Sequence, residues 1–448
     1  MFSFARYLFS CAFLLTLILF NSPAHAEWTW PFPFSSANSE AGKSGQSGSL
    51  SGTSAKPAGA EKASTTQAPA PKVNAAAAQP PASTFKSEAK PAEPVSPPKI
   101  QKPAPPRALS VFTPELKLGS MVLEGDTRWS GTLLIDGMVT VSPNTTLKVM
   151  PGSVIRFAAN SGILVYGRIA LQGTPESPII ITSVYETAGP SDWNGIFLAG
   201  TEKNNTFEHI VIRGADTAIQ ASFSALEANS ILIEDASTAL KLSNSTATVR
   251  NSAIFSSPAG ILATKSEIDL VSTTFDRNGS ALTLNSSALT AVNVKLRNSA
   301  QTAFTAENSH VKLDGMLFSF NLNGIRTTGC DGSITNSSFI SNKETAAIFT
   351  ASNLKFSDNH VSGSRVGLQL DDNSPALWRN SISGNSSYNL LYLGNERYFA
   401  GGNWLGQANR ESQEIAVFSK QPGALLTAPL LAVDPHPPVA LDSTKAND

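Results

Sequence analysis

Cysteine and histidine are scarce in this sequence, and their scarcity excludes several kinds of site. The 448 residues include two cysteines and five histidines. Cys11 lies close to the N-terminus, so Cys330 has no partner in the remainder of the chain and no disulfide framework is expected. Copper and other soft metals need clusters of His, Met or Cys, whereas these residues are scattered here. We therefore predict no metal site of that kind.

Charged and aromatic residues are also few. They make up 15% and 8% of the chain, and the formal net charge is −1, so no binding of nucleic acid is expected. The apolar spacing of three or four residues that predicts helices is missing from the repeated part of the chain. Small apolar residues, Ser, Thr and Asn fill the repeated region, and this composition suits a β-structure in which short side chains stack.

One apolar position recurs every 20 to 23 residues between about residues 216 and 393. The residue before it is usually small, and the residue two positions after it continues an alternating pattern, so each repeat contains a short strand. The recurring residues are Ile219, Leu240, Ile261, Leu282, Phe304, Ile325, Ile348, Leu368 and Leu390.

Three further positions recur within the same repeats. A second apolar column comprises Ile233, Ile254, Phe275, Leu296, Phe318, Phe339 and Val361. A serine column comprises Ser245, Ser266, Ser287, Ser309, Cys330, Ser352 and Ser374. An asparagine-rich column comprises Asn251, Ser272, Asn293, Gly315, Asn336, Asp358 and Asn380. We interpret Cys330 as the replacement of a turn serine, not as a nucleophile.

Short strands separated by Asn, Ser and Gly at fixed offsets predict a solenoid in which each repeat is one coil. Equivalent residues would stack at about 4.8 Å, with apolar ladders inside and polar ladders along the turns. Leucine-rich repeats have a similar length, but their Leu-x-x-Leu-x-Leu frame is missing. The repeats therefore predict an all-β, three-faced parallel β-helix with about 21–22 residues per coil.

Residues 1–26 have the pattern of a secretory signal peptide. A short apolar run from Leu8 to Phe20 follows Arg6, and Ala24-His25-Ala26 is an A-x-A cleavage site. The run is too short for a comfortable membrane span, although an uncleaved segment would act as an anchor. We expect a secreted or periplasmic protein of the cell envelope, without a transmembrane domain after cleavage of the signal.

Residues 27–107 are predicted to be a disordered linker rich in Pro, Ala, Ser and Lys. Between residues 40 and 107, nine Lys or Arg face four Glu, so the linker is either a solvated spacer or one that contacts anionic envelope polymers. The aromatic stretch Glu27 to Phe34 (EWTWPFPF) is either an exposed N-terminus or a docking peptide. The predicted folded domain spans residues 108–406, and residues 407–448 form a capping segment and tail.

Several local motifs resemble a known family. They include Pro151-Gly152 before an alternating strand, Gly173-Thr174 before another strand, Trp193-x-Gly195-Ile196, and Asn403-Trp404-Leu405-Gly406 near the end of the repeats. Together with the repeats, they resemble secreted bacterial right-handed parallel β-helix proteins of the pectin-lyase-like superfamily over roughly residues 120–406. The resemblance is specific for the fold and weak for activity.

The resemblance implies a set of catalytic motifs, most of which this chain lacks. Enzymes of the superfamily act on acidic polysaccharides with carboxylates that hold calcium, or with paired carboxylates as general acid and base. Only Asp371-Asp372 matches such a pair. Asp434-Pro435-His436 resembles an epimerase motif, but it lies in the Pro-rich tail outside the repeats. Calcium is expected only if the protein is an enzyme, and no other cofactor is expected.

Charged and polar residues gather on the late coils, where they form the candidate site. The candidate catalytic residues are Asp371, Asp372 and Arg365. The candidate binding residues are Arg326, Asp358, His360, Gln369, Arg379 and Tyr388. The alternative is that these residues form turns and surface charges. Trp378 and Tyr392 align with inward positions and are expected in the core.

Three functions remain open from the sequence. The first is a non-catalytic surface scaffold or glycan-binding module, which contacts a polysaccharide or another cell-envelope component through a polar outward sheet. The second is a polysaccharide lyase, hydrolase or epimerase that uses carboxylates on the late coils. The third is an envelope-anchored spacer protein, which an uncleaved N-terminal segment favours. A carboxylate pair that faces outward in a groove would favour the enzyme over the scaffold.

Overall fold

The computed structural model describes residues 107–406 and 417–436. The predicted signal peptide and nearly all of the predicted linker lie outside the described residues, as do residues 407–416 and 437–448 of the tail. The described residues form strands and turns and include no helix. In this part of the chain, no helix long and apolar enough to cross a membrane is found. The prediction of an all-β fold is confirmed.

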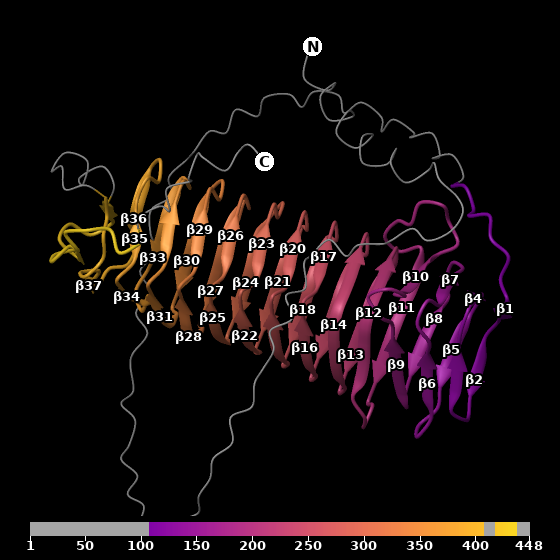
Figure 1. Ribbon diagram of the computed structural model, residues 1–448. Helices are drawn as coiled ribbons and strands as arrows, with labels where there is room; N and C mark the ends of the chain where they lie inside the picture. Colours follow the sequence, from indigo (N-terminus) through magenta and orange to yellow (C-terminus); the bar gives the residue numbers. More distant parts are fainter. Residues whose placement is uncertain (1–106, 407–416, 437–448) are drawn as a thin grey trace, which may run out of the picture. The chain divides into compact units, whose positions relative to one another are not determined.

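Each coil contributes one short strand to each of three parallel faces, and the coils lie side by side in a row (Figure 1). The chain passes from face A to face B to face C and then returns to face A in the next coil. We call the turns between the faces the AB, BC and CA corners. Strands pair in parallel with their equivalents in neighbouring coils, as Leu240 does with Ile219 and Ile261. The predicted three-faced β-helix is therefore confirmed.

Face A is a 14-stranded sheet, and faces B and C belong to one 23-stranded sheet. Face A consists of β2 (Met121–Leu123), β5 (Met138–Val141), β8 (Gly162–Val165), β11 (Trp193–Ala199), β13 (Ala215–Ser222), β15 (Thr238–Ser243), β18 (Ala259–Thr264), β21 (Ser280–Asn285), β24 (Thr302–Glu307), β27 (Asn323–Thr328), β30 (Thr345–Thr350), β33 (Val366–Leu370), β36 (Tyr388–Tyr392) and β38 (Val417–Ser419). Face B consists of β3 (Thr127–Trp129), β6 (Thr146–Val149), β9 (Arg168–Gln172), β16 (Thr246–Arg250), β19 (Glu267–Val271), β22 (Ala288–Val292), β25 (His310–Asp314), β28 (Asp331–Thr335), β31 (Asn353–Ser357) and β34 (Ala376–Trp378). Face C consists of β1 (Leu116–Leu118), β4 (Thr132–Ile135), β7 (Val154–Phe157), β10 (Ile179–Ser183), β17 (Ala253–Phe255), β20 (Thr274–Asp276), β23 (Lys295–Arg297), β26 (Leu317–Ser319), β29 (Ser338–Ile340), β32 (His360–Ser362) and β35 (Ser381–Ile382).

Two long strands join faces B and C. β12 (Asn205–Arg213) and β14 (Ala225–Glu234) run along face B, bend at the BC corner and continue along face C. The bends lie at His209 and Ser230, whose φ angles are 48° and 55°. In later coils the same corner interrupts the strand, and residues with positive φ such as Asn251 and Asn336 stand there. Asn tolerates this left-handed conformation better than most residues, which explains why the sequence favours it at this corner.

The apolar columns form the core, with one shift of register. Eight of the nine residues in the first column are fully buried and paired in register. The exception is Ile348, because Ile325 pairs with Ala347 rather than with Ile348. The prediction was wrong by one residue here, because both neighbours are apolar and the larger one looks like the core residue. Ile348 instead belongs to the outward row between Arg326 and Gln369, although it is only 4% exposed there.

Polar ladders satisfy the backbone at the corners. At the AB corner, the amide of Ser245 donates to Ser266 Oγ at 3.2 Å, and Ser245 Oγ donates to the carbonyl of Ser243. Cys330 occupies the same ladder, and its buried thiol donates to the carbonyls of Ala306 and Thr328. Its interpretation as a turn serine replacement is supported by this position.

A second ladder of asparagines lies at the BC corner. Asn359, Asn380 and Asn403 are fully buried, and their side chains contact one another from coil to coil at 2.8–3.1 Å. The predicted Asn column is displaced by one residue at its end, because Arg379 rather than Asn380 takes the positive-φ position. Two adjacent polar residues made the alignment ambiguous at that coil.

The last coil is covered by the C-terminal segment. β37 (Tyr398–Phe399) pairs with β39 (Leu425–Leu426), and the amide of Leu431 donates to the carbonyl of Asn403 at 3.0 Å. Tyr392 is buried, as predicted. Trp378 is 54% exposed, so its assignment to the core was wrong; the inward residue is Leu377, which pairs with Phe356.

Candidate functional site

The nine predicted site residues lie in separate places around the late coils. Asp371 and Asp372 are at the AB corner, Arg365 is at the CA corner, and Asp358 and Arg379 are at the BC corner with His360 beside them. Arg326, Gln369 and Tyr388 belong to face A. The described residues thus bring these side chains together in small groups on different edges of the coil rather than into one site. Their functional roles stay predictions.

The Asp371-Asp372 pair holds a turn. Asp372 accepts hydrogen bonds from the backbone amides of Asn395 and Glu396 and from the hydroxyl of Tyr392, each at 2.9 Å. These donors, the Glu396 amide first, lower the pKa of Asp372, because they stabilise the charged carboxylate. Asp371 accepts from the amide of Ala351 at 3.0 Å. Burial nevertheless raises the pKa of Asp371, so the two neighbouring carboxyl groups differ in their proton affinity.

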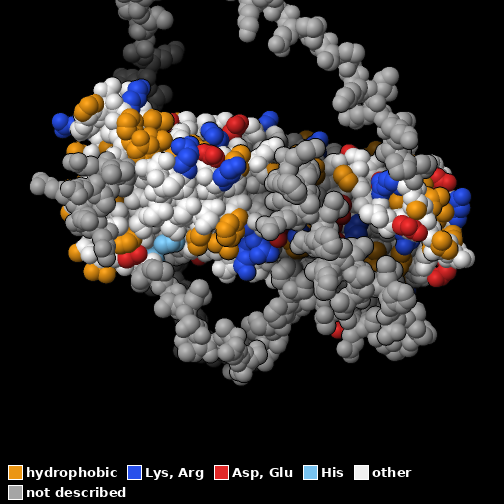
Figure 2. Space-filling view, turned by 90° about the horizontal axis from the view of Figure 1, so that it is seen from above, with side chains coloured by type: hydrophobic (Ala, Val, Ile, Leu, Met, Phe, Trp, Pro, Cys, Tyr) orange, Lys and Arg blue, Asp and Glu red, His pale blue; other side chains and the backbone are white. Residues whose placement is uncertain are grey.

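Two of the three predicted arginines each form an ion pair with the preceding coil. Arg365 Nε lies 2.7 Å from Glu344 Oε2, and Arg379 Nε lies 2.9 Å from Asp358 Oδ1. In both pairs the partners are separated in sequence by one coil. Arg213 with Glu234, Arg297 with Asp276, and His310 with Asp331 repeat this arrangement. Opposite charges are also interspersed on the face seen in Figure 2. Such pairs support coil stacking and leave these arginines less available to a ligand.

On face A, the outward row is mixed polar and apolar. Arg326 is exposed, whereas Gln369 is partly buried beside Leu391. Tyr388 packs against Phe418 of the C-terminal segment, with ring centroids 5.6 Å apart. Ile348 separates Arg326 from Gln369 in this row, so the predicted residues of face A do not form one group of convergent polar side chains.

His360 lies in a hollow that the sequence did not reveal. The hollow has a volume of about 430 Å³ and lies at the BC corner, lined by Asn336, Ile340, Asp358, His360 and the tail residue His436, among others. The tail motif Asp434-Pro435-His436 was set aside in the sequence because it lies outside the repeats. In the folded chain, this segment lies against the late coils, where His436 lines the hollow. The repeat pattern could not predict this contact, because the segment lies outside the repeats.

A second hollow lies at the AB corner of the early coils. It has a volume of about 250 Å³ and is formed by the turns after β5, β8 and β11. Its lining comprises Pro143, Asn144, Thr145, Tyr166, Gly167, Arg168, Ala199, Gly200, Glu202 and Lys203. We call it the Tyr166 hollow. Sequence reasoning missed it because these coils lack the regular repeat that directed attention to the later ones.

The Tyr166 hollow has a rigid floor and an exposed aromatic wall. A Cβ at Gly167 would approach the carbonyl oxygens of Thr145 and Ser142 to 2.2 and 2.3 Å, so only glycine permits this close coil contact. Tyr166 is 44% exposed. Arg168 donates from Nε to the carbonyl of Asn204 at 3.0 Å, which fixes its guanidinium at the edge of the hollow.

Buried Asn205 holds the loop that carries Glu202 and Lys203. Its Oδ1 accepts the amide of Ile169 at 3.0 Å, and its Nδ2 donates to Thr201 Oγ1 and to the carbonyl of Ala225. These bonds connect three coils and position the loop. The arrangement places an aromatic ring, two cationic groups and one carboxylate around a small open hollow, which suits a hydroxylated, negatively charged ligand.

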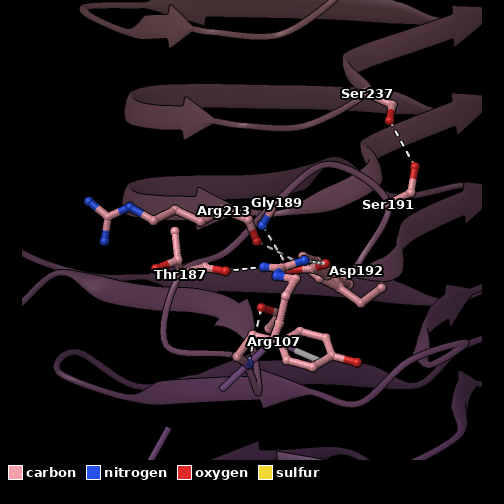
Figure 3. Close-up of polar contacts among 10 residues, drawn as sticks. Arg107, Thr187, Gly189, Ser191, Asp192, Arg213 and Ser237 are labelled. Atoms are coloured by element: carbon pink, nitrogen blue, oxygen red, sulfur yellow. Dashed lines mark hydrogen bonds and ion pairs between the residues drawn. The ribbon is translucent and has the colours of Figure 1, made fainter. Parts of the chain in front are cut away.

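A third polar cluster, beside the loop between β10 and β11, anchors the backbone (Figure 3). The guanidinium of Arg107 contacts both carboxylate oxygens of Asp192 and the carbonyl of Thr187, and it lies 4.6 Å from the centroid of the Tyr185 ring. Asp192 is 8% exposed and also accepts the amide of Gly189. The donors and acceptors satisfy one another, so this cluster holds the loop rather than a ligand.

The acidic, histidine and cysteine side chains of the described residues do not gather into a candidate metal site. Across residues 107–406 and 417–436, no group of three or more His, Cys, Asp or Glu side chains converges in a way that could hold a metal ion. Calcium binding at the late carboxylates therefore gains no support from these residues.

Comparisons with known proteins agree with the fold. A family model described as a right handed beta helix region matches residues 279–403, and one described as a pectate-lyase like beta helix domain matches residues 121–241. No match is found among curated protein sequences.

Similar solved structures are distant. A periplasmic alginate epimerase has 9% identity and a TM-score of 0.37, with 72% of this chain and 79% of that chain covered. An alginate lyase from Paenibacillus sp. has 11% identity and a TM-score of 0.30, with 64% and 93% covered. The catalytic unit of an alpha-1,3-glucanase from Streptomyces thermodiastaticus has 11% identity and a TM-score of 0.29, with 67% and 62% covered. The family models and the three parallel faces, rather than these structures, identify the chain as a right-handed parallel β-helix protein.

Proposed function

We propose that this protein binds an acidic polysaccharide and that the Tyr166 hollow is the binding site. The observation that carries the proposal is the exposed ring of Tyr166 beside Arg168 and Lys203 on a floor of closely packed backbone. The role is that of a non-catalytic glycan-binding module. It keeps the glycan at the cell surface or in the periplasm, if residues 1–26 direct secretion as predicted.

The side chains of the hollow match the chemistry of a uronic acid. The apolar face of a sugar ring packs against the flat face of tyrosine, which also offers a polar hydroxyl. A sugar carboxylate pairs with the guanidinium of Arg168 and the ammonium of Lys203, and charge-assisted hydrogen bonds of this kind are stronger than neutral ones. The carboxylate of Glu202 accepts hydrogen bonds from sugar hydroxyls and disfavours a ligand with dense negative charge, such as a phosphate cluster.

The late carboxylates support binding over catalysis. A general acid or base needs a carboxyl group with free access to the substrate. Asp372 instead accepts three hydrogen bonds from the following coil, and Asp371 accepts the amide of Ala351 in the preceding one. The carboxylates serve as turn anchors under this proposal, and the scaffold role expected from buried turn ladders is favoured.

A second candidate is a polysaccharide-active enzyme. The pKa of Asp371 is raised by burial, whereas that of Asp372 is lowered by hydrogen bonds, and neighbouring carboxyl groups with opposite shifts can divide the roles of acid and base. The distinguishing assay measures release of reducing ends or unsaturated products from acidic and neutral polysaccharides, with and without calcium. Turnover that is lost in Asp371→Asn would establish the enzyme and replace the binding proposal.

The binding proposal is tested with the full chain and a panel of oligosaccharides. Isothermal titration with uronate oligomers and neutral oligomers of equal length should show binding to the uronates alone. Tyr166→Ala should weaken it about tenfold, or about 1.4 kcal/mol, through loss of the stacked ring. Arg168→Gln should weaken it by a similar amount and reduce its dependence on salt.

Matched controls lie on face A of the late coils. Tyr388→Ala and Arg326→Gln remove the same residue types outside the Tyr166 hollow and should leave affinity unchanged. Equal affinity for uronate and neutral oligomers, or full affinity in Tyr166→Ala, contradicts the proposed site. The envelope-anchored spacer remains a separate prediction, which N-terminal sequencing of the mature protein tests by showing whether residues 1–26 are removed.

A further inference from the structure

The C-terminal segment runs back along the late coils after it has covered the last one. The amide of Tyr398 donates to the carbonyl of Ala424, and the amide of Gly402 donates to that of Pro429, at 2.8 and 2.7 Å. The amide of Leu431 then donates to the carbonyl of Asn403. A few residues later, His436 reaches the BC-corner hollow that His360 also lines. The segment thus connects the cover of the last coil to a pair of histidines.

Both imidazoles in this hollow have an unpartnered nitrogen. His360 Nε2 lies 2.9 Å from Ser362 Oγ, whereas its Nδ1 is buried without a hydrogen-bond partner. His436 Nε2 is likewise buried and without a partner. Buried polar atoms without a hydrogen-bond partner are uncommon and energetically costly. The presence of two such nitrogen atoms on residues that line one hollow therefore calls for an explanation. A metal ion is a poor explanation, because no third His, Cys, Asp or Glu among the described residues joins them in suitable geometry.

The charges that face this pair are few and partly neutralised. On the coil side, Asp358 is paired with Arg379 at 2.9 Å. On the tail side, Asp434 Oδ1 accepts the amide of His436 at 2.8 Å. Burial lowers the pKa of His360, the charge of Asp434 opposes that effect, and the neighbouring His436 adds to it. The surroundings therefore accommodate the neutral imidazole of His360 better than its imidazolium ion.

We propose that His360 and His436 form an acid-sensitive latch that holds the C-terminal segment against the BC corner. Near neutral pH, the uncharged ring of His360 and the ring of His436 share the hollow. When the pH falls, protonation of His360 places a positive charge in a partly desolvated space, whereas release of the segment leaves that charge hydrated. Release opens the hollow and loosens the cover of the last coil. This latch does not depend on the proposed glycan binding.

The direction of the pH effect follows from linkage. A histidine whose pKa is lower in the docked state than in the released state binds its proton more readily after release. Docking is therefore strongest above the ordinary imidazole pKa of about 6.5 and weakens as the pH falls below it. Each unit by which docking lowers the pKa corresponds to roughly a tenfold weaker docking equilibrium at low pH.

Hydrogen–deuterium exchange of the full-length protein tests the latch. Exchange is followed by mass spectrometry in peptides that cover residues 398–403 and 424–436, near pH 7.5 and near pH 5, with correction for intrinsic rates. Protection in the wild type should fall several-fold at the lower pH. In His360→Gln, which keeps a neutral polar side chain, protection should be the same at both pH values. In His436→Gln, which removes the neighbour that further lowers the pKa of His360, the loss of protection should be smaller than in the wild type.

Two further variants distinguish the latch from a general loss of structure. Asp434→Asn keeps the acceptor for the His436 amide but removes the anion, so the docked-state pKa of His360 falls further and release should begin at a higher pH than in the wild type. His310→Gln changes a histidine that pairs with Asp331 on β28, and it should behave as the wild type. The proposal is overturned if the wild type shows no loss of protection, or if His436→Gln loses protection as the wild type does.

Discussion

The AB corner takes two forms along this chain, and the two leave different side chains free. In the middle coils, from Ser224 to Ser352, hydroxyl groups donate to carbonyls of their own turn and accept amides of the preceding coil. In the early coils, the same corner carries Tyr166, Arg168 and Lys203 around a hollow. In the middle coils, the serine hydroxyls of this corner are hydrogen-bonded within the β-helix. In the early coils, the side chains that line the hollow remain available to a ligand.

The difference comes from coil length. Leu240 pairs with Ile261 after one coil of regular length, so identical turns stack and like side chains meet. Ile163 pairs with Ile196 after a longer coil, and the AB-corner turns of the early coils, residues 142–145, 166–167 and 200–204, differ in length and do not repeat one another. In regular coils, the polar side chains of the corners form hydrogen bonds with the neighbouring coil. In irregular coils, some polar side chains lack such partners and are available to bind a ligand. The late coils become irregular again near Asp371, and the hollow lined by His360 lies at that end of the chain.

The strongest test of the regular region removes part of its aromatic core. Phe339 is stacked on Phe318 with centroids 4.5 Å apart and is fully buried. Phe339→Ala should lower the free energy of unfolding by about 4 kcal/mol, because it removes packing and leaves a cavity. Urea denaturation measures the change. The exposed Phe418 provides a control, and a loss in Phe339→Ala no greater than in Phe418→Ala would refute the stacking argument.

The asparagine ladder gives the next largest effect. Asn380 accepts the amide of Asn359 at 3.0 Å and donates to the carbonyl of Phe356 at 2.8 Å, and its side chain is fully buried. Asn380→Ala should cost about 3 kcal/mol, since it leaves several backbone groups buried without partners. Denaturation midpoints report it. Asn353→Ala, at an exposed strand position, should change stability by less than about 0.5 kcal/mol; equal losses would show that the ladder is dispensable.

At the irregular end, Asp372 should contribute stability that depends on pH. Its pKa is lowered by the Glu396 and Asn395 amides, so its contribution is present above the ordinary Asp pKa of about 4 and is lost as the pH falls through its folded-state pKa. Asp372→Asn should be less stable than the wild type near pH 7, and the difference should shrink as the pH falls through the folded-state pKa of Asp372. Thermal unfolding at several pH values measures it.

The neighbouring carboxyl group provides the control for that test. Burial raises the pKa of Asp371, so replacement by neutral Asn should not destabilise the protein near pH 7. If Asp371→Asn and Asp372→Asn lose the same stability with the same pH dependence, the assignment of Asp372 as the anchor of the turn is wrong.

The smallest effect is expected in the serine ladder itself. Cys330→Ser should stay within about 0.5 kcal/mol of the wild type, because a hydroxyl makes the same bonds to neighbouring carbonyls as the thiol does. Cys330→Val keeps the side chain apolar but removes the donor, and it should be less stable than Cys330→Ser. The same urea titration compares them, and the reverse order would show that packing rather than hydrogen bonding decides this position.

Particular residues show how far sequence could predict the fold. The columns from Ile219 to Ile325 were placed correctly because successive strands are separated by polar turns of nearly constant length. At Ile348 the register was displaced by one, since Ala347 and Ile348 are both apolar and alternation alone does not choose between them. Trp378 was misplaced for a similar reason: its spacing from earlier repeats aligned it with Phe356, whereas Leu377 is the residue that pairs with Phe356 and fills the core.

The site was predictable only in part. Asp358 and Arg379, and Arg365 with Glu344, are partners because a distance of one repeat in sequence is one coil in space, and spacing alone could have found these pairs. The Tyr166 hollow could not be found that way, because its three turns belong to coils of unequal length. Their proximity became visible only when the strands on either side were paired.

The sequence by itself determined the parallel β-helix, since a regular period of polar and apolar residues leaves few other ways to bury the apolar columns and pair the strands. Tertiary structure alone decided which polar side chains remain available. It directed Asp372 toward the amides of the following coil, and it brought His436 to the hollow that His360 lines, across a long sequence separation. Repetition specifies contacts between adjacent coils, whereas loops and tails make contacts without any period, and only the folded chain reveals them.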